Sequence, residues 1–221
     1  MTTSLAFAIS NDMSLTLHAM QRSANCYKVR LLLAHLAMPF VLKDVDILRG
    51  DTRTPEFLAM NPRGRVPVLQ LGEGTILIES NAILMYLGEG TTFVPEDKVA
   101  RAIMMQWLFF EQNSHHPAIG EARFWMSLVP GGRELKRDLI DDWMEQGEEA
   151  LGRMEAQLVV RPFIAGDTLT LADIALYANT HLAHEADLDL ALFPAVRAWV
   201  DRVAALPGHV DMDWRPAPAG A

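Results

Sequence analysis

The chain has 221 residues and is 50% hydrophobic, so it can bury a substantial core in one large domain or two small ones. Its formal net charge of −9 argues against a protein that tracks nucleic-acid phosphates, because 28 acidic residues outnumber 19 scattered lysines and arginines. The single cysteine, Cys26, cannot form an internal disulfide or a cysteine-rich zinc site, which favours a reducing, cytoplasmic location.

Residues 1–13 show no pattern of regular structure. They contain a short apolar stretch, residues 5–9, but no basic segment, so they fit neither a signal peptide nor a membrane span. We expect a flexible leader over residues 1–13, and Met13 is an alternative start to Met1.

Residues 14–89 alternate between the two-residue period of strands and the period of helices. Val29, Leu32 and Leu36 share one helical face, and the glycines around residue 73 separate two β-rich runs as a hairpin turn does. In chain order we expect strand 14–19, helix 26–37, strand 41–45, helix 51–60, strands 66–71 and 75–78, and helix 79–88. The first domain, residues 14–89, is therefore predicted to be βαβαββα.

Residues 90–97 lack periodicity and contain Pro95, so they are expected to be a linker. All later elements are predicted to be helical, which makes residues 98–215 an all-α domain and residues 216–221 a loose tail. The expected helices are 99–128 with a kink at Pro117, 134–158, 170–185 and 194–206.

Thr170 and Asp173 have the spacing of a capping box, in which each side chain bonds the backbone N–H of the other. We therefore assign Asp173 to the folding of the second domain and not to chemistry.

Two strings relate these elements to a known family. Residues 61–69 read Asn-Pro-Arg-Gly-Arg-Val-Pro-Val-Leu, and residues 79–84 read Glu-Ser-Asn-Ala-Ile-Leu. With these strings in a βαβαββα unit followed by helices, the chain resembles the cytosolic glutathione transferases. Residues 23–30 and 106–112 are similar to the bacterial theta- and nu-like members. The resemblance spans nearly the whole chain and implies a thioredoxin-like N-terminal domain, an all-α C-terminal domain and a homodimer.

The resemblance also implies how glutathione, the co-substrate, is bound. Val66 offers its backbone to the cysteinyl part ahead of a cis-Pro67, while Glu79 takes the γ-glutamyl ammonium group and Ser80 the carboxylate. Helix N-termini favour anions, which agrees with the role of Ser80, although a capping pair without a ligand has the same sequence. Arg65 is expected to reach the glycyl carboxylate. Other basic residues are rivals for that role: Arg63, Arg53 and Lys43.

Ser23 is the expected centre of the chemistry. Glutathione reacts as a thiolate, whereas a free thiol has a pKa of about 8.5, so the enzyme must stabilise the anion. The Ser23 hydroxyl can donate to that sulfur, and Asn25 is a second candidate donor that nu-like relatives are expected to use. The alternative is that Ser23 or Asn25 only caps the helix. Cys26 is expected to be a buried helix residue, because Ser23 replaces the attacking cysteine of a Cys-x-x-Cys motif.

A second-substrate pocket is expected between the domains, along the helix that follows the linker. Its candidate residues are Trp107, Phe110, Glu111, Ser114 and His115. We expect no metal site, because His115 and the adjacent His116 point in different directions.

The primary hypothesis is an enzyme that activates glutathione as a thiolate for attack on a small electrophile. Reduction of a disulfide or peroxide by glutathione is the alternative, since conjugation and reduction share one site. A non-catalytic binding module of the same fold is a further alternative, although Val66, Pro67, Glu79 and Ser80 are all present. We expect neither nucleic-acid nor membrane partners.

Overall fold

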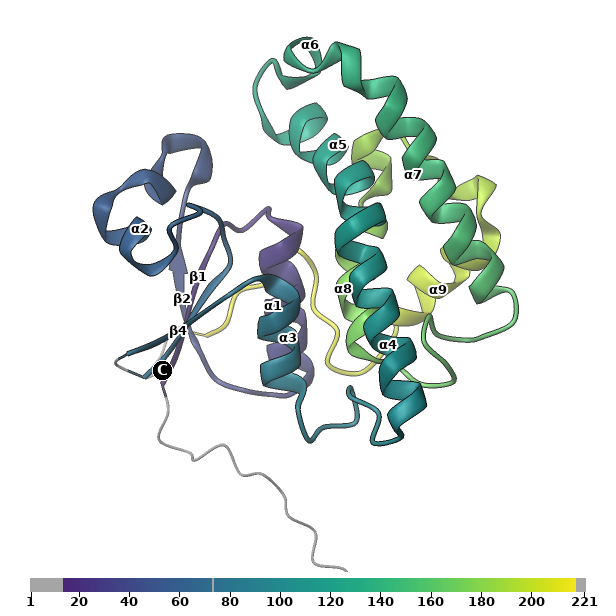
Figure 1. Ribbon diagram of the computed structural model, residues 1–221, viewed down its shortest axis with the longest axis horizontal. Helices are drawn as coiled ribbons and strands as arrows, with labels where there is room; N and C mark the ends of the chain where they lie inside the picture. The colour runs from purple at the N-terminus through teal and green to yellow at the C-terminus, as the bar shows by residue number, and fades with distance from the viewer. Residues whose placement is uncertain (1–13, 73, 218–221) are drawn as a thin grey trace, which may run out of the picture. The chain divides into compact units, whose positions relative to one another are not determined.

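The computed structural model describes residues 14–72 and 74–217 and divides into two compact units, which are coloured along the chain in Figure 1. The first unit comprises Met1–Val94 together with Val210–Ala221, and the second comprises Pro95–His209. The expected leader at residues 1–13 lies outside the described residues, as does the end of the expected tail, residues 218–221.

The first unit is built on a mixed four-stranded sheet with the strand order β2-β1-β3-β4. Strand β1 is parallel to β2 and antiparallel to β3, which pairs antiparallel with β4. The elements of this unit are β1 (Leu15–Ala19), α1 (Ala24–His35), β2 (Val41–Asp44), α2 (Pro55–Met60), β3 (Val68–Leu71), β4 (Thr75–Ile78) and α3 (Ser80–Gly88). The predicted βαβαββα order is confirmed.

Helices α1 and α3 lie side by side on one face of the sheet, and α2 lies on the other side (Figure 1). Phe57 of α2 packs in a buried cluster with Val45 and Val68. The sequence predicts one apolar face for α1, whereas the structure buries this helix on nearly every side, including Lys28 and Arg30.

The chain after residue 209 explains part of that burial. Arg30 donates to the carbonyl oxygens of Gln21 and Met212, each at 2.8 Å, and the Tyr27 hydroxyl donates to the carbonyl oxygen of Val210 at 2.6 Å. The sequence assigns residues up to 215 to the helical domain, whereas these contacts place residues 210–217 with the first unit. Periodicity ends with the last helix, so it cannot indicate where the irregular segment after it packs.

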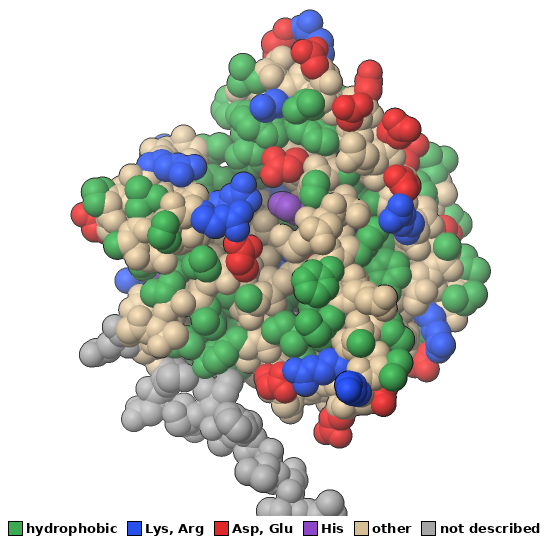
Figure 2. Space-filling model, in the orientation of Figure 1, with side chains coloured by type: hydrophobic (Ala, Val, Ile, Leu, Met, Phe, Trp, Pro, Cys, Tyr) green, Lys and Arg blue, Asp and Glu red, His purple; other side chains and the backbone are tan. Residues whose placement is uncertain are grey.

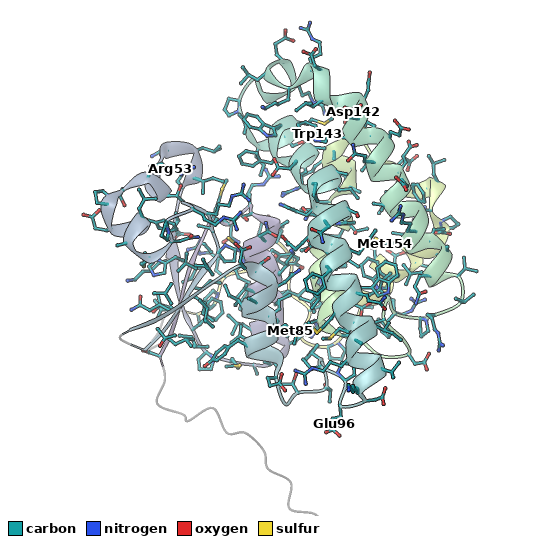
Figure 3. All side chains as sticks on the ribbon, viewed as in Figure 1. Arg53, Met85, Glu96, Asp142, Trp143 and Met154 are labelled. Atoms are coloured by element: carbon teal, nitrogen blue, oxygen red, sulfur yellow. The ribbon has the colours of Figure 1, made fainter. Side chains whose placement is uncertain are left out.

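The second unit is helical throughout its regular structure, as predicted. Its α-helices are α4 (Lys98–Phe110), α5 (Glu121–Arg123), α6 (Gly132–Leu135), α7 (Arg137–Leu158), α8 (Leu171–Thr180) and α9 (Pro194–Ala204). Fully buried side chains from different helices form its core, among them Met104, Leu176, Trp199 and Met154, the last of which is labelled in Figure 3.

The segment around Pro117 differs from the prediction. The sequence predicts a kinked α-helix, whereas Glu111–Gly120 forms a π-helix that contains Pro117, and Phe124–Leu128 forms another. Proline has no N–H to give to the carbonyl four residues earlier, so the regular α-helical pattern is interrupted there. The wider π turn accommodates that interruption without ending the helical path.

The predicted capping box at the start of α8 is confirmed. One oxygen of Asp173 accepts from the backbone N–H of Thr170 at 2.9 Å, and the other accepts from the N–H of Ile164 at 2.8 Å and from the Trp199 indole at 2.9 Å. The carboxylate therefore ties the preceding loop, α8 and α9 together. Burial raises the pKa of Asp173, and these hydrogen bonds to its charged form oppose that rise.

The surface carries mixed charge. On the face shown in Figure 2, basic side chains are interspersed with acidic ones. Among the described residues, no helix is both long enough and apolar enough to cross a bilayer.

Candidate active site

Ser23 lies where β1 gives way to α1. Its extended backbone makes it the N-cap of the helix, and its hydroxyl oxygen accepts from the backbone N–H of Cys26 at 3.4 Å. A hydroxyl that accepts a capping bond still has its own hydrogen to donate. Ser23 and Asn25 are both partly exposed. Capping is thus observed, and it leaves the Ser23 hydroxyl able to donate to a ligand.

Cys26 faces the interior next to these two residues. Its side chain is fully buried, which confirms the expectation of a buried helix residue. Burial raises the pKa of the Cys26 thiol, because the thiolate would lose its hydration. A thiol held neutral and away from solvent is a poor nucleophile.

The loop between α2 and β3 is organised by the buried Asn61. Its amide donates to the carbonyl oxygen of Arg65 at 2.7 Å, and its oxygen accepts from the N–H of Arg63 at 3.1 Å. The Val66–Pro67 peptide bond that follows is cis, as the resemblance implies. Val66 is partly buried against the sheet, and the Arg65 side chain is exposed.

Arg63 and Arg53, two of the rivals for the role of Arg65, have contacts of their own. Arg63 forms an ion pair with Glu79 in which both side chains are about half exposed. Arg53, labelled in Figure 3, packs against Gly64, where an added β-carbon would lie 2.5 Å from its guanidinium group. Gly64 has a φ of +59°, so both its conformation and its surroundings suit glycine.

Glu79 and Ser80 form the start of α3. Glu79 has φ 68° and ψ 113°, which is unusual for a residue with a side chain and is a feature that concentrates at functional sites. Ser80 is 5% exposed, and the first backbone N–H groups of a helix have no partner within it. The start of α3 therefore presents helix N–H groups, which are donors suited to a carboxylate, beside the Ser80 hydroxyl.

A chain of hydrogen bonds connects α1 with α3. The Ser80 hydroxyl donates to Oδ1 of Asn25 at 3.4 Å, and the Lys28 ammonium group donates to the Ser80 hydroxyl oxygen at 3.3 Å. The expected sulfur-binding and carboxylate-binding residues are thus in contact. Sequence reasoning missed Lys28, although a lysine among the apolar residues of α1 was a visible signal.

The second-substrate candidates lie on α4 and on the π-helix after it. Trp107 and Phe110 are partly exposed, with their rings in edge-to-face contact at 5.1 Å, and Ser114 is partly exposed. Glu111 and His115 are fully buried, and Nε2 of His115 lies 2.8 Å from the Thr180 hydroxyl. Full burial leaves Glu111 and His115 no exposed surface in this structure, and the pocket expected along this helix stays a prediction.

Comparison with known proteins places these features in a family. Residues 22–89 match the glutathione S-transferase N-terminal domain, and residues 102–207 match the C-terminal domain. Among solved structures, a possible glutathione S-transferase from Rhodopseudomonas palustris is 51% identical with a TM-score of 0.90, covering 93% of this chain and 92% of that one.

Two further relatives bear on the chemistry. A glutathione transferase family member from Pseudomonas fluorescens Pf-5, solved with two glutathione bound, is 26% identical with a TM-score of 0.77, covering 88% of this chain and 90% of that one. The disulfide-bond oxidoreductase YfcG of Escherichia coli is 28% identical over 83% of this chain and 87% of its own length. The two domain matches and the 51% identity show that the chain belongs to the glutathione S-transferase family.

Proposed function

We propose that this protein binds glutathione in its first unit and activates it as a thiolate for attack on a small electrophile. The observation that carries the proposal is the 3.4 Å hydrogen bond between Ser80 and Asn25. Because of it, the donors at the starts of α1 and α3 form one continuous site. A single ligand with a thiol and a distant carboxylate can contact both.

The roles of the residues follow from their chemistry. The Ser23 hydroxyl donates to the sulfur of glutathione, and the Asn25 amide supplies a second donor, so the thiolate is favoured over the thiol. The backbone N–H of Ser80 and the other first N–H groups of α3 bind the γ-glutamyl carboxylate, while the Ser80 hydroxyl donates to the Asn25 amide. Glu79 attracts the ammonium group of the same amino-acid moiety.

The rest of glutathione contacts the loop before β3. The backbone of Val66, ahead of Pro67, pairs with the cysteinyl part as an added strand would. The Arg65 side chain is exposed, and in the described contacts of its loop Arg65 takes part through its backbone, so the side chain is assigned to the glycyl carboxylate. Arg63 instead holds Glu79.

Glutathione-dependent reduction of disulfides is the second candidate function. The relative named as a disulfide-bond oxidoreductase and the neighbour solved with two glutathione molecules both favour it. Two glutathione thiols would be oxidised to glutathione disulfide while one substrate disulfide is reduced to two thiols. Because Cys26 is buried with a raised pKa, glutathione and not the protein would supply the attacking sulfur.

We further propose a cytoplasmic homodimer. Helix α4 exposes several large apolar side chains, with Val99 67% exposed and Phe109 61% exposed. Burial of such a face against a second copy would remove apolar surface from water. Sedimentation analysis of the wild-type protein and of a Phe109→Glu variant tests this, and a monomeric wild-type protein would contradict it.

The binding proposal is tested by calorimetric titration with glutathione. Ser80→Ala should weaken binding by about tenfold, since it removes the hydroxyl that joins the Lys28 ammonium group to the Asn25 amide in this site. Ser14→Ala, at an exposed serine of the same unit, is the matched control. Wild-type protein that binds no glutathione at millimolar concentration would contradict the proposal and leave a non-catalytic module of this fold. Rates with an aryl halide and with a small disulfide then separate conjugation from reduction.

A further inference from the structure

Lys28 is one of two fully buried cations of α1, the other being Arg30. Lys28 lies in the second turn of α1, and its side chain is fully buried. Removing an ammonium group from water carries a large desolvation penalty, and lysine is almost never fully buried unless it has partners. Its described partner is the Ser80 hydroxyl, at 3.3 Å, which belongs to the proposed carboxylate site.

The hydrogens available in this cluster determine the directions of its bonds. An ammonium group can only donate, so the Ser80 oxygen must accept from Lys28. Ser80 then has one hydrogen, and it points to Oδ1 of Asn25. Because the oxygen of the Asn25 amide faces Ser80, its NH₂ group faces away. That group is the only part of the amide that can donate to a thiolate.

The buried Arg30, two residues along α1, is engaged elsewhere. Its guanidinium group donates to the carbonyl oxygens of Gln21 and Met212, and so it joins the turn after β1 to the segment after residue 209. Lys28 is therefore the buried cation of α1 that contacts the proposed site. Burial raises the pKa of the Cys26 thiol, and the charges of Arg30 and then of Lys28 oppose that rise, so the fields of both cations reach a sulfur at the start of this helix.

We propose that Lys28 is a positioning residue for glutathione activation. It acts through Ser80 to orient the Asn25 amide, and it supplies a fixed positive charge beside the carboxylate and the thiolate. This inference rests on the proposed function, because it takes Ser80 and Asn25 as the residues that bind glutathione. No covalent step involves Lys28, and it does not contact the sulfur.

The test replaces Lys28 and follows both glutathione affinity and the pKa of the bound thiol, measured from thiolate absorbance. Lys28→Met removes the charge and keeps most of the stem, and Lys28→Arg keeps the charge. Lys98→Met, at an exposed lysine of α4, is the matched control. We expect Lys28→Met to weaken glutathione binding about tenfold and to raise the thiol pKa by about one unit. Lys28→Arg should keep part of the glutathione affinity and part of the lowering of the thiol pKa. Lys98→Met should change neither the affinity nor the thiol pKa.

A folded Lys28→Met protein with wild-type affinity and an unchanged thiol pKa would overturn the inference alone. Wild-type protein that binds no glutathione would overturn the proposed function as well. If Lys28→Met does not fold, the inference is tested with Ser80→Ala instead. Since Lys28 acts through Ser80, that variant must raise the thiol pKa in addition to weakening binding, and an unchanged thiol pKa would overturn the inference.

Discussion

Replacement of Asp173 by alanine should destabilise the second unit more than the loss of an ordinary helix cap does. The change removes the acceptor of four buried donors, which are the backbone N–H groups of Ile164 and Thr170, the Thr170 hydroxyl and the Trp199 indole. Each unsatisfied buried donor costs about 1–3 kcal/mol, while removal of a buried charge offsets part of that cost. We therefore expect a loss of about 3–5 kcal/mol in the free energy of unfolding.

The matched control is Asp97→Ala. Asp97 caps α4 by accepting from the N–H groups of Val99 and Ala100, but it lies at the surface, so its loss should cost about 1 kcal/mol. Urea unfolding followed by circular dichroism measures both variants against the wild-type protein. If Asp173→Ala costs no more than Asp97→Ala, the buried carboxylate does not hold α8 and α9 together as argued.

Three further predictions concern stability. Burial lowers the pKa of His181 to about 4, from 6.5, so the unfolded chain binds a proton that the folded protein does not. Stability should therefore fall by up to about 3 kcal/mol as the pH drops from about 6.5 to 4. His181→Phe keeps a ring against Tyr177 and should make the loss of stability with falling pH shallower. His184→Gln, at an exposed histidine, is the control and should leave that loss unchanged. Equal pH profiles for the wild-type protein and His181→Phe would contradict the assignment to His181. A chain ending at His209 should melt lower than one ending at Ala217, because Arg30 and Tyr27 lose carbonyl partners at 212 and 210; coincident melting curves would count against it. Gly132→Ala should destabilise, since its β-carbon would lie 2.0 Å from the Trp125 carbonyl oxygen. Gly152 lies on α7 with open space around it, so Gly152→Ala should stabilise the protein by about 0.5–1 kcal/mol. If both substitutions shift the melting temperature in the same direction, the packing argument is refuted.

The order of strands and helices was predictable because local period and turn residues determine it. The capping box at Thr170 and Asp173 was equally local, since its two residues lie three positions apart. The two glycines and the β-rich runs around residue 73 likewise predicted the β3–β4 pairing that the structure has.

Features that depend on distant segments were not predictable in this way. Helical spacing indicates the apolar face of α1 but not what covers its other faces, and residues 210–215 come from the opposite end of the chain. For the same reason the sequence did not indicate that Lys28 is buried, because its burial depends on α3 and the rest of the fold. At Pro117 the missing N–H was recognised, but sequence does not indicate whether a kink or a π-helix accommodates it.

The pKa of the glutathione thiol in the bound state tests the central claim most directly. Thiolate absorbance against pH should give a bound thiol pKa at least one unit below the value of about 8.5 for a free thiol. Ser23→Ala should raise it toward the free value, and Asn25→Ala should raise it by a smaller amount. A bound thiol that titrates like free glutathione, or one unaffected by either substitution, would contradict the account.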